Sequence, residues 1–498
     1  MVKLVYRVVS ACGALGCGFP RESLQKALNG GIDAVVADAG AATMGPHYLG
    51  SGTQHFEREA VKNDFRKMVE AGERIRGPVI LGSCGTAGGE RNLDWMLDIA
   101  REIFEEQHVR DAKVAVIRSE VDPAIAIDAL RVHALRPLGS APALDEAALR
   151  ASTIVAQMGI HPLFAALASG AKYVFAGRSC DAALFAADMI RHGISPGLAY
   201  HAGLVLEGGA RACEPGSSCD CLVAEIYDDG SAVFIAPDET RRCTPYSIAA
   251  HSLHKEAHPQ LQFYPEGVLA TDKSEFFAVD AHTAGVRASR FYRSRRTAPS
   301  RIKLEGARRR GLVYEWTMHH LLQNEDVIRN RLFPISYYHA DGREWLCAGQ
   351  ARADYFEVGE PPGTEDLDAR TLCVIEDAPP RGKPYGTRCL LDMARVVRSK
   401  GMGWLTIDVF FVSEEAYEMG LVSNVFCPRS LADALDLKRR SIVGSYFVDS
   451  CRAIRIAIER PRNLTPADGH DAFGALQQAA IERLVVPLHA NDRAAQAS

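Results

Sequence analysis

Residues 32–52 of this chain, IDAVVADAGAATMGPHYLGSG, decide its fold. A short apolar run, residues 34–37, stops at Asp38 and opens into a loop that contains Gly40, Gly45, Gly50 and Gly52. An apolar run of this length between turn residues is typical of a buried parallel strand. Open α/β sheets bind their ligands at the carboxyl ends of such strands, so we expect Asp38 at the lip of a pocket. The alternative is that Asp38 only caps the turn that follows.

The same pattern, an apolar strand followed by a small-residue loop and an amphipathic helix, recurs through residues 1–200. The expected strands are residues 4–10, 34–38, 79–82, 113–117, 153–157 and 173–176. Strands that alternate with helices form a parallel sheet flanked by helices. The predicted fold class is therefore α/β.

Two domains are expected. The first, residues 1–384, would combine an α/β core (1–200) with an appended β-rich region (201–384), in which residues 221–235 indicate a hairpin. The second, residues 385–498, would be a small α+β domain with a helix over 390–398 and a buried strand over 404–412. The Pro- and Gly-rich residues 377–386, DAPPRGKPYG, are typical of a linker.

The composition excludes several classes of protein. Of the 498 residues, 47% are hydrophobic and 24% charged, as in an ordinary globular protein. A net charge of -5 gives no field that would attract nucleic acid or anionic lipid, and no apolar stretch approaches the roughly 18 residues of a membrane span. Thirteen scattered cysteines do not suggest a disulfide framework. We expect a cytoplasmic homo-oligomer with no nucleic-acid or membrane partner.

Four loops after the expected strands are rich in glycine and small hydroxyl residues: 11–18, 40–52, 82–90 and 177–181. Glycine lets the backbone approach a ligand and turn its amides toward an anion. None of these loops has the GxGxxG or GxxxxGK[ST] spacing of a nucleotide site, and glycine needed only for tight turns is the alternative. The predicted substrate-binding residues are Ser10, Gly13, Ser51, Gly52, Ser83, Cys84, Gly85, Arg178 and Ser179.

Several longer strings resemble the acyclic terpene utilisation (AtuA-like) family. They run from ADAG and GPHYLGSG through AVKNDF, GSCGTAGGERNLDWMLDI, GRSCDAALFAA, PGLAYHAGLVLEGGA and CTPYSIAAHSL to KLEGA, and cover nearly all of residues 1–380. DMARVVRSKGMGWLTIDVFF, RAIRIAIERP and FGALQQAAI resemble a second, small family of unassigned function that is often fused to the first or encoded beside it. The usual SKNAGP of that family is SKGMGW here, so Gly401, Met402 and Trp404 depart from its pattern.

The resemblance implies a role in organic-acid catabolism, where a lyase step on a carboxylated acyl-CoA is proposed for the founding members. Lyase or hydratase chemistry next to a carbonyl needs a base, an acid and dipoles or charges that stabilise an enolate. The expected ligand is a small carboxylic acid or its CoA thioester, held by the loop amides and by Arg178, since guanidinium binds carboxylate well. The candidate acids and bases are Asp38, Asp181, Glu90, Glu120, His161 and His201.

Each candidate also has a structural interpretation. Asp181 and His161 can cap helices, His201 lies within an expected helix, and Glu120 can simply pair with Arg118. A hydrolase with Ser83, Cys84 or Ser179 as nucleophile is the second hypothesis, although GSCG lacks the GxSxG pattern. A non-catalytic binding or assembly subunit is the third. No cofactor is predicted: the Cys213, Cys219, Cys221 and Cys243 group matches no CxxC zinc pattern, while a divalent ion on carboxylates stays possible.

Overall fold

The computed structural model describes residues 2–40, 44–138, 141, 143–253, 256–293, 301–345, 354–361, 373–377, 384–400, 404–459 and 474–488. They fall into two compact units. The first draws on residues 1–137, 142–252 and 263–363, and the second on residues 138–141, 253–262 and 364–498. Most of the proposed linker (378–383), the SKGMGW positions 401–403 and the tail from residue 489 lie outside the described residues.

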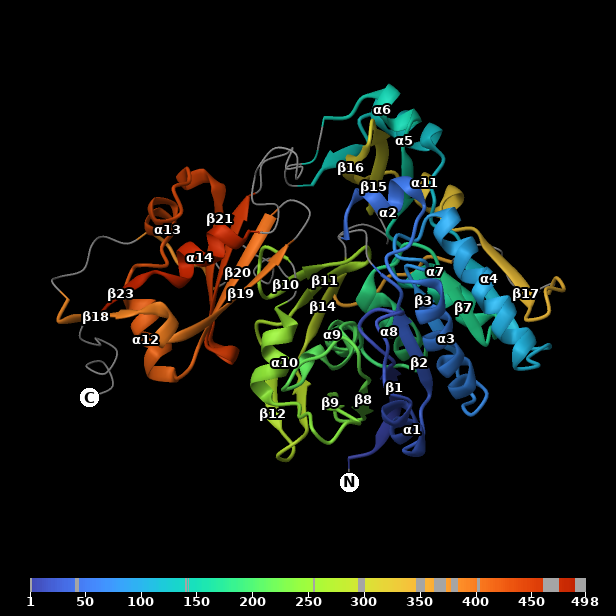
Figure 1. Cartoon of the computed structure of the whole chain (residues 1–498), viewed down its shortest axis with the longest axis horizontal. Coiled ribbons are helices and arrows are strands. Elements are labelled where there is room, and N and C mark those ends of the chain that lie inside the picture. Colours follow the sequence, from blue (N-terminus) through green and yellow to red (C-terminus); the bar gives the residue numbers. More distant parts are fainter. Residues whose placement is uncertain are drawn as a thin grey trace. The chain divides into compact units, whose positions relative to one another are not determined.

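A ten-stranded sheet forms the centre of the first unit (Figure 1). Its order is β12-β13-β9-β8-β1-β2-β3-β7-β4-β17. The neighbours β1, β2, β3, β7 and β4 are parallel, and the flanking strands are antiparallel. The bounds are β1 (Leu4–Ser10), β2 (Ala34–Asp38), β3 (Val79–Gly82), β4 (Lys113–Ile117), β7 (Tyr173–Ala176), β8 (Leu222–Tyr227), β9 (Ser231–Ile235), β12 (Glu275–Ala278), β13 (Ala284–Arg287) and β17 (Ile335–His339).

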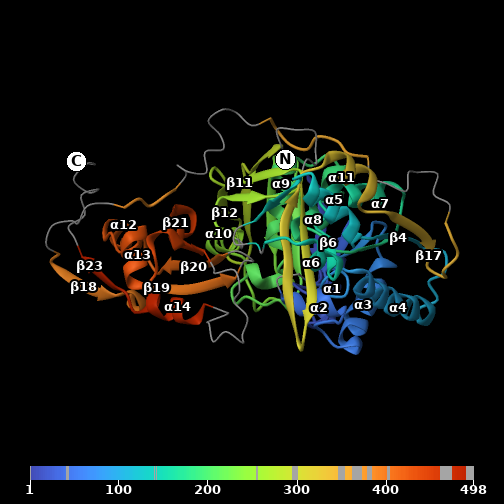
Figure 2. The ribbon, with the colours of Figure 1, turned by 90° about the horizontal axis from the view of Figure 1, so that it is seen from above.

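Helices cover both faces of this sheet. Along β2, Ala34 and Val36 pack in the core under α7, α8 and α9, whereas Val35 and Ala37 pack in the core under α1, α3 and α4. In Figure 2, α3 and α4 lie to one side of the strands and α7 and α8 to the other. The helices are α1 (Arg21–Asn29), α2 (Pro46–Ser51), α3 (Arg58–Gly72), α4 (Glu90–Glu106), α5 (Pro123–Arg131), α6 (Glu146–Arg150), α7 (Ile160–Ala168), α8 (Asp181–Arg191), α9 (Pro196–Leu206), α10 (Pro245–Ser252) and α11 (Glu325–Arg331).

The predicted α/β class, with a parallel sheet flanked by helices, is confirmed, with one correction. Residues 153–157 were expected as a further parallel strand, but β6 (Thr153–Ala156) belongs to a separate sheet of order β5-β16-β15-β6. There β6 pairs antiparallel with β15 (Ile302–Arg310), which pairs with β16 (Val313–Leu322), and β16 pairs with β5 (Leu135–Pro137). The sequence of β6 specifies a buried strand but not its partner. Elsewhere β10 (Leu261–Phe263) precedes β11 (Gly267–Ala270), which pairs with β14 (Arg290–Arg293).

The second unit contains a four-stranded antiparallel sheet of order β19-β20-β22-β21 and a separate β18-β23 pair. Its elements are β18 (Gly386–Cys389), β19 (Ala394–Lys400), β20 (Trp404–Phe411), α12 (Glu414–Val422), α13 (Pro428–Ala434), β21 (Ile442–Val448), β22 (Ala453–Glu459), α14 (Ala475–Glu482) and β23 (Val485–Leu488). The predicted buried strand over 404–412 is confirmed. The predicted helix over 390–398 is wrong: a 3-10 turn, Leu390–Asp392, leads into β19, because Val396 and Val397 favour a strand and β20 offers a pairing edge.

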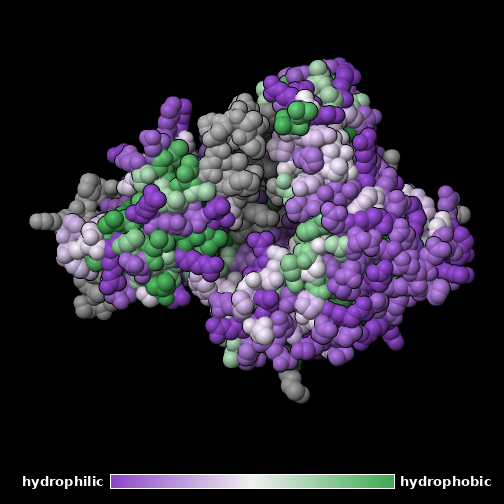
Figure 3. All heavy atoms as spheres, viewed as in Figure 1, coloured by the Kyte–Doolittle hydropathy of each residue, from purple (hydrophilic) through white to green (hydrophobic). Residues whose placement is uncertain are grey.

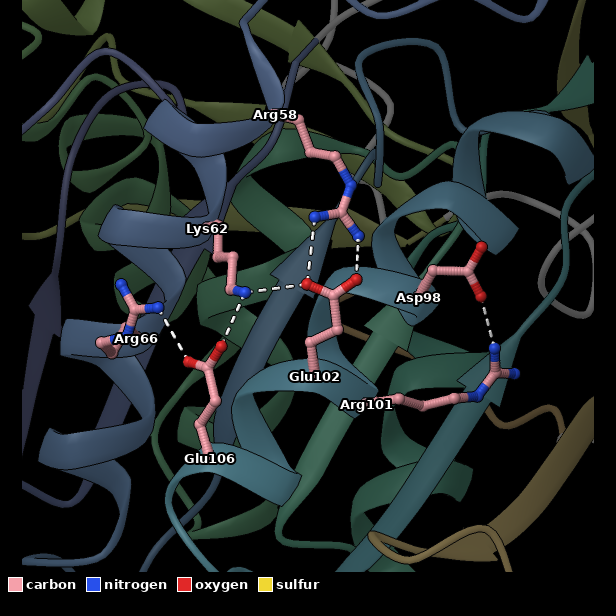
Figure 4. Close-up of polar contacts among 7 residues, drawn as sticks. All are labelled: Arg58, Lys62, Arg66, Asp98, Arg101, Glu102 and Glu106. Carbon is pink, nitrogen blue, oxygen red and sulfur yellow. Dashed lines mark hydrogen bonds and ion pairs between the residues drawn. The ribbon is translucent and has the colours of Figure 1, made fainter.

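The outer surface over α3 and α4 is polar (Figure 3). A ladder of ion pairs joins the two helices there (Figure 4): Arg58 and Lys62 contact Glu102, and Lys62 and Arg66 contact Glu106. Within the described ranges, no helix is both long enough and apolar enough to cross a bilayer.

Candidate functional site

The four glycine-rich loops lie side by side at the carboxyl edge of the parallel strands. The amide of Leu15, in the first loop, donates to the carbonyl of Asp38 (2.9 Å), and the amide of Ala39, in the second, donates to the carbonyl that ends β3 (2.9 Å). The amide of Ser83, in the third loop, donates to the carbonyl of Gly177 in the fourth (2.9 Å). Backbone hydrogen bonds therefore join the loops in the order of strands β1, β2, β3 and β7.

Asp38 ends β2, and its carboxyl group is buried among these loops, with 6% of the residue exposed. Burial and the charge of Asp181 raise the pKa of Asp38 well above its usual range. The charge of Arg178 and a hydrogen bond from the Ser83 hydroxyl oppose this rise. Among the described residues, none donates a hydrogen bond to Asp38 Oδ1. This environment favours the neutral, protonated form of Asp38.

Ser83 follows β3 directly and has a left-handed backbone conformation, with φ 43°. This conformation is costly for a residue with a Cβ atom, and such strain is common at functional sites. The Ser83 Oγ accepts hydrogen bonds from Arg178 Nη1 (3.3 Å) and from the amide of Ser179 (3.4 Å). The strained turn thus places the Ser83 hydroxyl within hydrogen-bond distance of the guanidinium.

Arg178 is the buried cation of the site. Its Nε lies 2.8 Å from Glu305 Oε2, and its Nη1 donates to the carbonyl of Ser179 (2.8 Å) and lies 3.6 Å from Asp181 Oδ1. Burial alone would lower the pKa of this guanidinium, but Glu305 and Asp181 raise it above its usual value. Arg178 therefore stays charged, with several of its donors already bound to protein acceptors.

Glu305 was not among the residues predicted from the sequence. Strand β15 brings it to the site, 127 positions beyond Arg178 in the chain, together with Lys303, whose Nζ lies 3.0 Å from Glu305 Oε1. Burial raises the pKa of Glu305, but the charges of Arg178 and Lys303 outweigh burial and lower it. Lys303 and Glu305 belong to the KLEGA string, whose resemblance to the family was a sequence signal for them. Periodicity and spacing gave no reason to place this string beside the glycine loops.

The site is closed. Arg178, Ser83, Ser179 and Glu305 are almost fully buried. The side chain of Asp181 is 17% exposed and that of Lys303 25%, so solvent reaches the site from these two residues. On the α3 and α4 side of the sheet, the cavity between the first three loops measures only about 10 Å³ and is lined by residues such as Leu15, Ala39 and Thr86. A small acid can enter only if the covering loops shift.

Glu90 begins α4, and Glu120 lies in the segment after β4. The amide of Glu90 donates to Glu120 Oε2 (2.7 Å), and Arg118 forms ion pairs with Glu90 and with Asp94 (3.1 Å to the latter). Glu120 thus serves the N-terminus of α4, while the ion pairs that the structure describes for Arg118 are with Glu90 and Asp94 and not, as considered above, with Glu120.

The two candidate histidines bind partners other than Asp38. His161 Nε2 donates to the carbonyl of Phe356 (2.8 Å), and its Nδ1 lies 3.2 Å from Glu266 Oε1. His201 is held between the hydroxyls of Ser289 (2.6 Å) and Ser252 (2.9 Å), and burial lowers its pKa to about 3. The His201 imidazole is therefore neutral and hydrogen-bonded at both nitrogens, which suits a structural role.

The remaining predicted binding residues divide between the loops. Ser179 and Cys84 line the Asp38 region, and the Ser179 hydroxyl donates to the carbonyl of Gly177 (2.9 Å). Burial, followed by the charge of Asp38, raises the pKa of the Cys84 thiol. The other members belong to their own loops: Ser10 donates to Cys12 O (3.4 Å), Gly13 packs on Gly208, Ser51 donates to His47 O (2.6 Å), Gly52 packs on Arg91 and Gly85 packs on Asn92.

The charges of Arg178 and Asp181 thus act on the buried Asp38 carboxyl, and this arrangement can serve acid–base chemistry. Glu207 is a third acid whose charge acts on Asp38. Among the described residues, no group of three His, Cys, Asp or Glu side chains has the geometry to hold a metal ion.

Comparison with known families bears out the resemblance of the sequence motifs. The model of the acyclic terpene utilisation family protein AtuA matches residues 7–321. A domain of unknown function, DUF4387, matches residues 390–484. Neither the curated proteins nor the solved structures compared with the chain gave a match.

Proposed function

The chain belongs to the acyclic terpene utilisation family AtuA, and from this premise we propose that it is an enzyme acting on a small carboxylic acid or its CoA thioester. The proposed reaction is the loss or addition of a group beside a carbonyl, as in a lyase or hydratase. The observation that carries the proposal is that the charges of Asp181 and Arg178 both act on the buried Asp38 carboxyl, while Asp181 Oδ1 lies 3.6 Å from Arg178 Nη1.

The two carboxyl groups have complementary roles in this proposal. Asp38, whose pKa is raised by burial and by the charge of Asp181, is the general acid that protonates the departing group. Asp181, at the first turn of α8 and open to solvent, is the base that takes the alpha proton. Two acids whose environments differ in this way are a recurring solution for proton transfer at neutral pH.

The positive charges and loop amides would stabilise the enolate. Arg178 stays charged because Glu305 holds it, and Lys303 presents an ammonium group at the solvent-reached side. Charge that develops on the substrate carbonyl oxygen is stabilised most by donors already fixed in place. Lys303 is the better candidate for binding the substrate carboxylate, since Arg178 already serves Ser83, Ser179 and Glu305.

Ligand identification comes first in the test. The full chain is screened against organic acids and acyl-CoAs for a rise in melting temperature, since a ligand that prefers the folded state raises apparent stability. With any ligand found, exchange of its alpha hydrogen is followed by NMR in deuterated water.

We expect exchange with the wild type and its loss, by a factor of about 100 or more, in Asp181→Asn. Asp98→Asn, in an exposed pair on α4, is the control and should exchange normally. No exchange with the wild type, together with pathway function that survives in both Asp38→Asn and Asp181→Asn while the purified chain still binds its partner, would instead favour a binding or assembly subunit.

A hydrolase is the second candidate, and the strained Ser83 favours it. A nucleophile needs a nearby base, and Asp38, whose pKa the Ser83 hydroxyl lowers, would fill that role only in its ionised form. The raised pKa of Cys84 argues against a thiolate at that position. A hydrolase would leave an acyl adduct on Ser83, found by mass spectrometry with a reactive substrate analogue and absent in Ser83→Ala.

Homo-oligomerisation remains part of the proposal. Exposed apolar side chains such as Leu391 and Val412 on the second unit offer surface that a partner copy can cover. Light scattering of the purified chain gives the molar mass directly.

A further inference from the structure

Three cysteine side chains meet beside the first glycine-rich loop. Cys12 and Cys17 lie in the loop after β1, and Cys219 lies just before β8, the antiparallel neighbour of β1. The Cys17 thiol donates to the carbonyl of Ser218 (3.2 Å), the residue directly before Cys219, and the side chains of Cys12 and Cys219 are close enough to lower the pKa of Cys17. The sheet thus brings together thiols from two distant parts of the chain.

Solvent reaches two of these thiols. Cys12 is fully buried, whereas Cys17 is half-buried and Cys219 is exposed. The fourth cysteine nearby, Cys221, is buried and its thiol donates to the carbonyl of Ala11 (3.2 Å). A reagent in solution therefore meets Cys17 and Cys219 first.

The backbone around Cys17 is held firmly. The amides of Gly16 and Gly18, on either side of Cys17, both donate to Asp64 Oδ2 (3.0 and 2.9 Å). Asp64 is itself fully buried on α3, and its Oδ1 lies 3.2 Å from Lys67 Nζ. The Cys17 sulfur is therefore presented in one position beside Cys219.

The electrostatics distinguish the two thiols. Hydrogen bonds from Cys12 and from Cys219 lower the pKa of Cys17 to about 7, although burial and the charge of Asp64 oppose this. Burial and the neighbouring Cys17 raise the pKa of Cys219 to about 11. A thiolate beside a protonated thiol is the arrangement in which one sulfur attacks and the other resolves.

We propose that Cys17 and Cys219 form a site of reversible thiol oxidation whose reactant is a peroxide. The Cys17 thiolate attacks one oxygen of hydrogen peroxide, and the O–O bond breaks. Cys17 becomes a sulfenic acid, and hydroxide is released. The Cys219 thiol then attacks that sulfur, the S–O bond breaks, and water leaves. Two thiols are oxidised to one disulfide while the peroxide, by the same two electrons, is reduced to water.

The disulfide would fasten the first loop to the segment before β8. Gly13 already donates its amide to the carbonyl of Ser218 (2.8 Å), and it packs so closely that a Cβ there would lie 2.5 Å from the carbonyl oxygen of Gly208. Fixing this contact covalently would stiffen the first loop, which is joined to Asp38 through Leu15. Oxidation would then change the mobility of the closed site.

The test uses the full, reduced chain, treated with hydrogen peroxide and then with a thiol-blocking reagent, and maps disulfides by peptide mass spectrometry. We expect a link between the peptide with Cys12 and Cys17 and the peptide with Cys219, reversed by dithiothreitol. The link should disappear in Cys17→Ser and in Cys219→Ser, and persist in Cys12→Ser and in Cys389→Ser, an exposed thiol outside the group. In Cys219→Ser, dimedone should trap a sulfenic acid on Cys17.

An internal control accompanies these variants. Cys213 and Cys243 have sulfurs 3.6 Å apart but are both buried, so they should stay reduced in the folded chain. Alkylation of Cys17 should rise with pH around a midpoint near 7. A link through Cys12, oxidation of the Cys213 and Cys243 pair before Cys17, or no dimedone adduct in Cys219→Ser would overturn the proposal.

Discussion

At the scale of single residues, Asp38 works against the stability of the fold. Its carboxyl is buried, faces the charge of Asp181 and leaves Oδ1 without a hydrogen bond among the described residues. A buried polar group that is not fully paired costs free energy. Residues retained at such a cost are more often functional than structural.

We predict that Asp38→Asn stabilises the protein while removing its activity. The pKa of Asp38 is raised in the folded state, so the folded chain binds this proton more tightly than the unfolded chain does. The wild type therefore loses stability as pH rises from about 4, the unfolded pKa, toward the folded pKa, and the asparagine variant does not. Urea unfolding at several pH values should show the gap widening with pH, to about 1–3 kcal/mol at neutral pH.

Asp181→Asn is the matched control for that measurement. It removes the charge of Asp181 but not the burial that also raises the pKa of Asp38, so it should weaken the pH dependence. In a variant that already carries Asp38→Asn, it should bring no comparable gain in stability. A gap between wild type and Asp38→Asn that is constant with pH would show that Asp38 titrates normally.

The buried pair Arg178 and Glu305, unlike Asp38, stabilises the fold. Both side chains are almost fully enclosed, with Nε and Oε2 2.8 Å apart. Removing one partner leaves the other charge buried without compensation. We predict that Glu305→Gln lowers the free energy of unfolding by about 3–5 kcal/mol, measured by urea titration, whereas Asp98→Asn in an exposed pair changes it little. Equal effects of the two substitutions would contradict this.

The sequence predicts part of the site around Asp38 and Arg178 but not all of it. Asp38, Ser83, Arg178 and Asp181 each follow a strand of the parallel sheet, so the rule that ligands bind at strand ends places them together. Glu305 could not be found in that way, because β15 belongs to another sheet. His161 and His201 have the right chemistry, but their partners, Glu266 and Ser289, come from distant segments that periodicity does not locate.

At the scale of elements, short-range sequence patterns predicted the core strands well. They failed where pairing with a distant strand determines whether a segment is a helix or a strand. Strand β2 is uniformly apolar because helices cover both of its faces. Strand β19 contains arginines and a lysine, which also suit a surface helix, and only its pairing with β20 makes it a strand. Long-range pairing overrides a weak local preference.

The ladder between α3 and α4 provides an element-scale prediction. Hydrogen bonds from Arg58 and Lys62 lower the pKa of Glu102 to about 2. A lowered folded pKa means stabilisation that is present above the unfolded value, 4.5, and lost as pH falls toward 2. We predict that Glu102→Gln lowers the melting temperature slightly at neutral pH and has no effect in acid.

Salt provides the second measurement for the ladder. The side chains of Arg58 and Glu102 are exposed. The effect of Glu102→Gln should therefore be larger at about 0.02 M salt than at about 0.5 M, where charges are screened within a few ångströms. Asp98→Asn is the control, because Asp98 forms an exposed pair with Arg101 on its own helix. A deficit that salt leaves unchanged would mean that the aliphatic packing of Glu102, not its charge, matters.

At the scale of the whole molecule, each unit has a core of its own. The core of the second unit includes Ile407, Phe411 and Ile456 and is separate from the cores on the two faces of the large sheet. Separate cores allow separate unfolding. The two family matches, residues 7–321 and 390–484, follow the same division.

Arg455 therefore offers a test of independence. It is 1% exposed, it pairs with both carboxylate oxygens of Asp408 (2.7 Å each), and its Nη1 donates to the carbonyls of Leu253 (2.8 Å) and Glu256 (2.9 Å), which belong to the same unit. We predict that Arg455→Ala destabilises this unit by about 3–5 kcal/mol, because Asp408 is left buried and unpaired. Hydrogen exchange should accelerate in β20 and β22 and stay unchanged in β1, β2 and β3. Arg439→Ala, which removes a half-exposed pair with Asp377, should change neither group, and acceleration in both groups with Arg455→Ala would mean that the chain unfolds as one cooperative body.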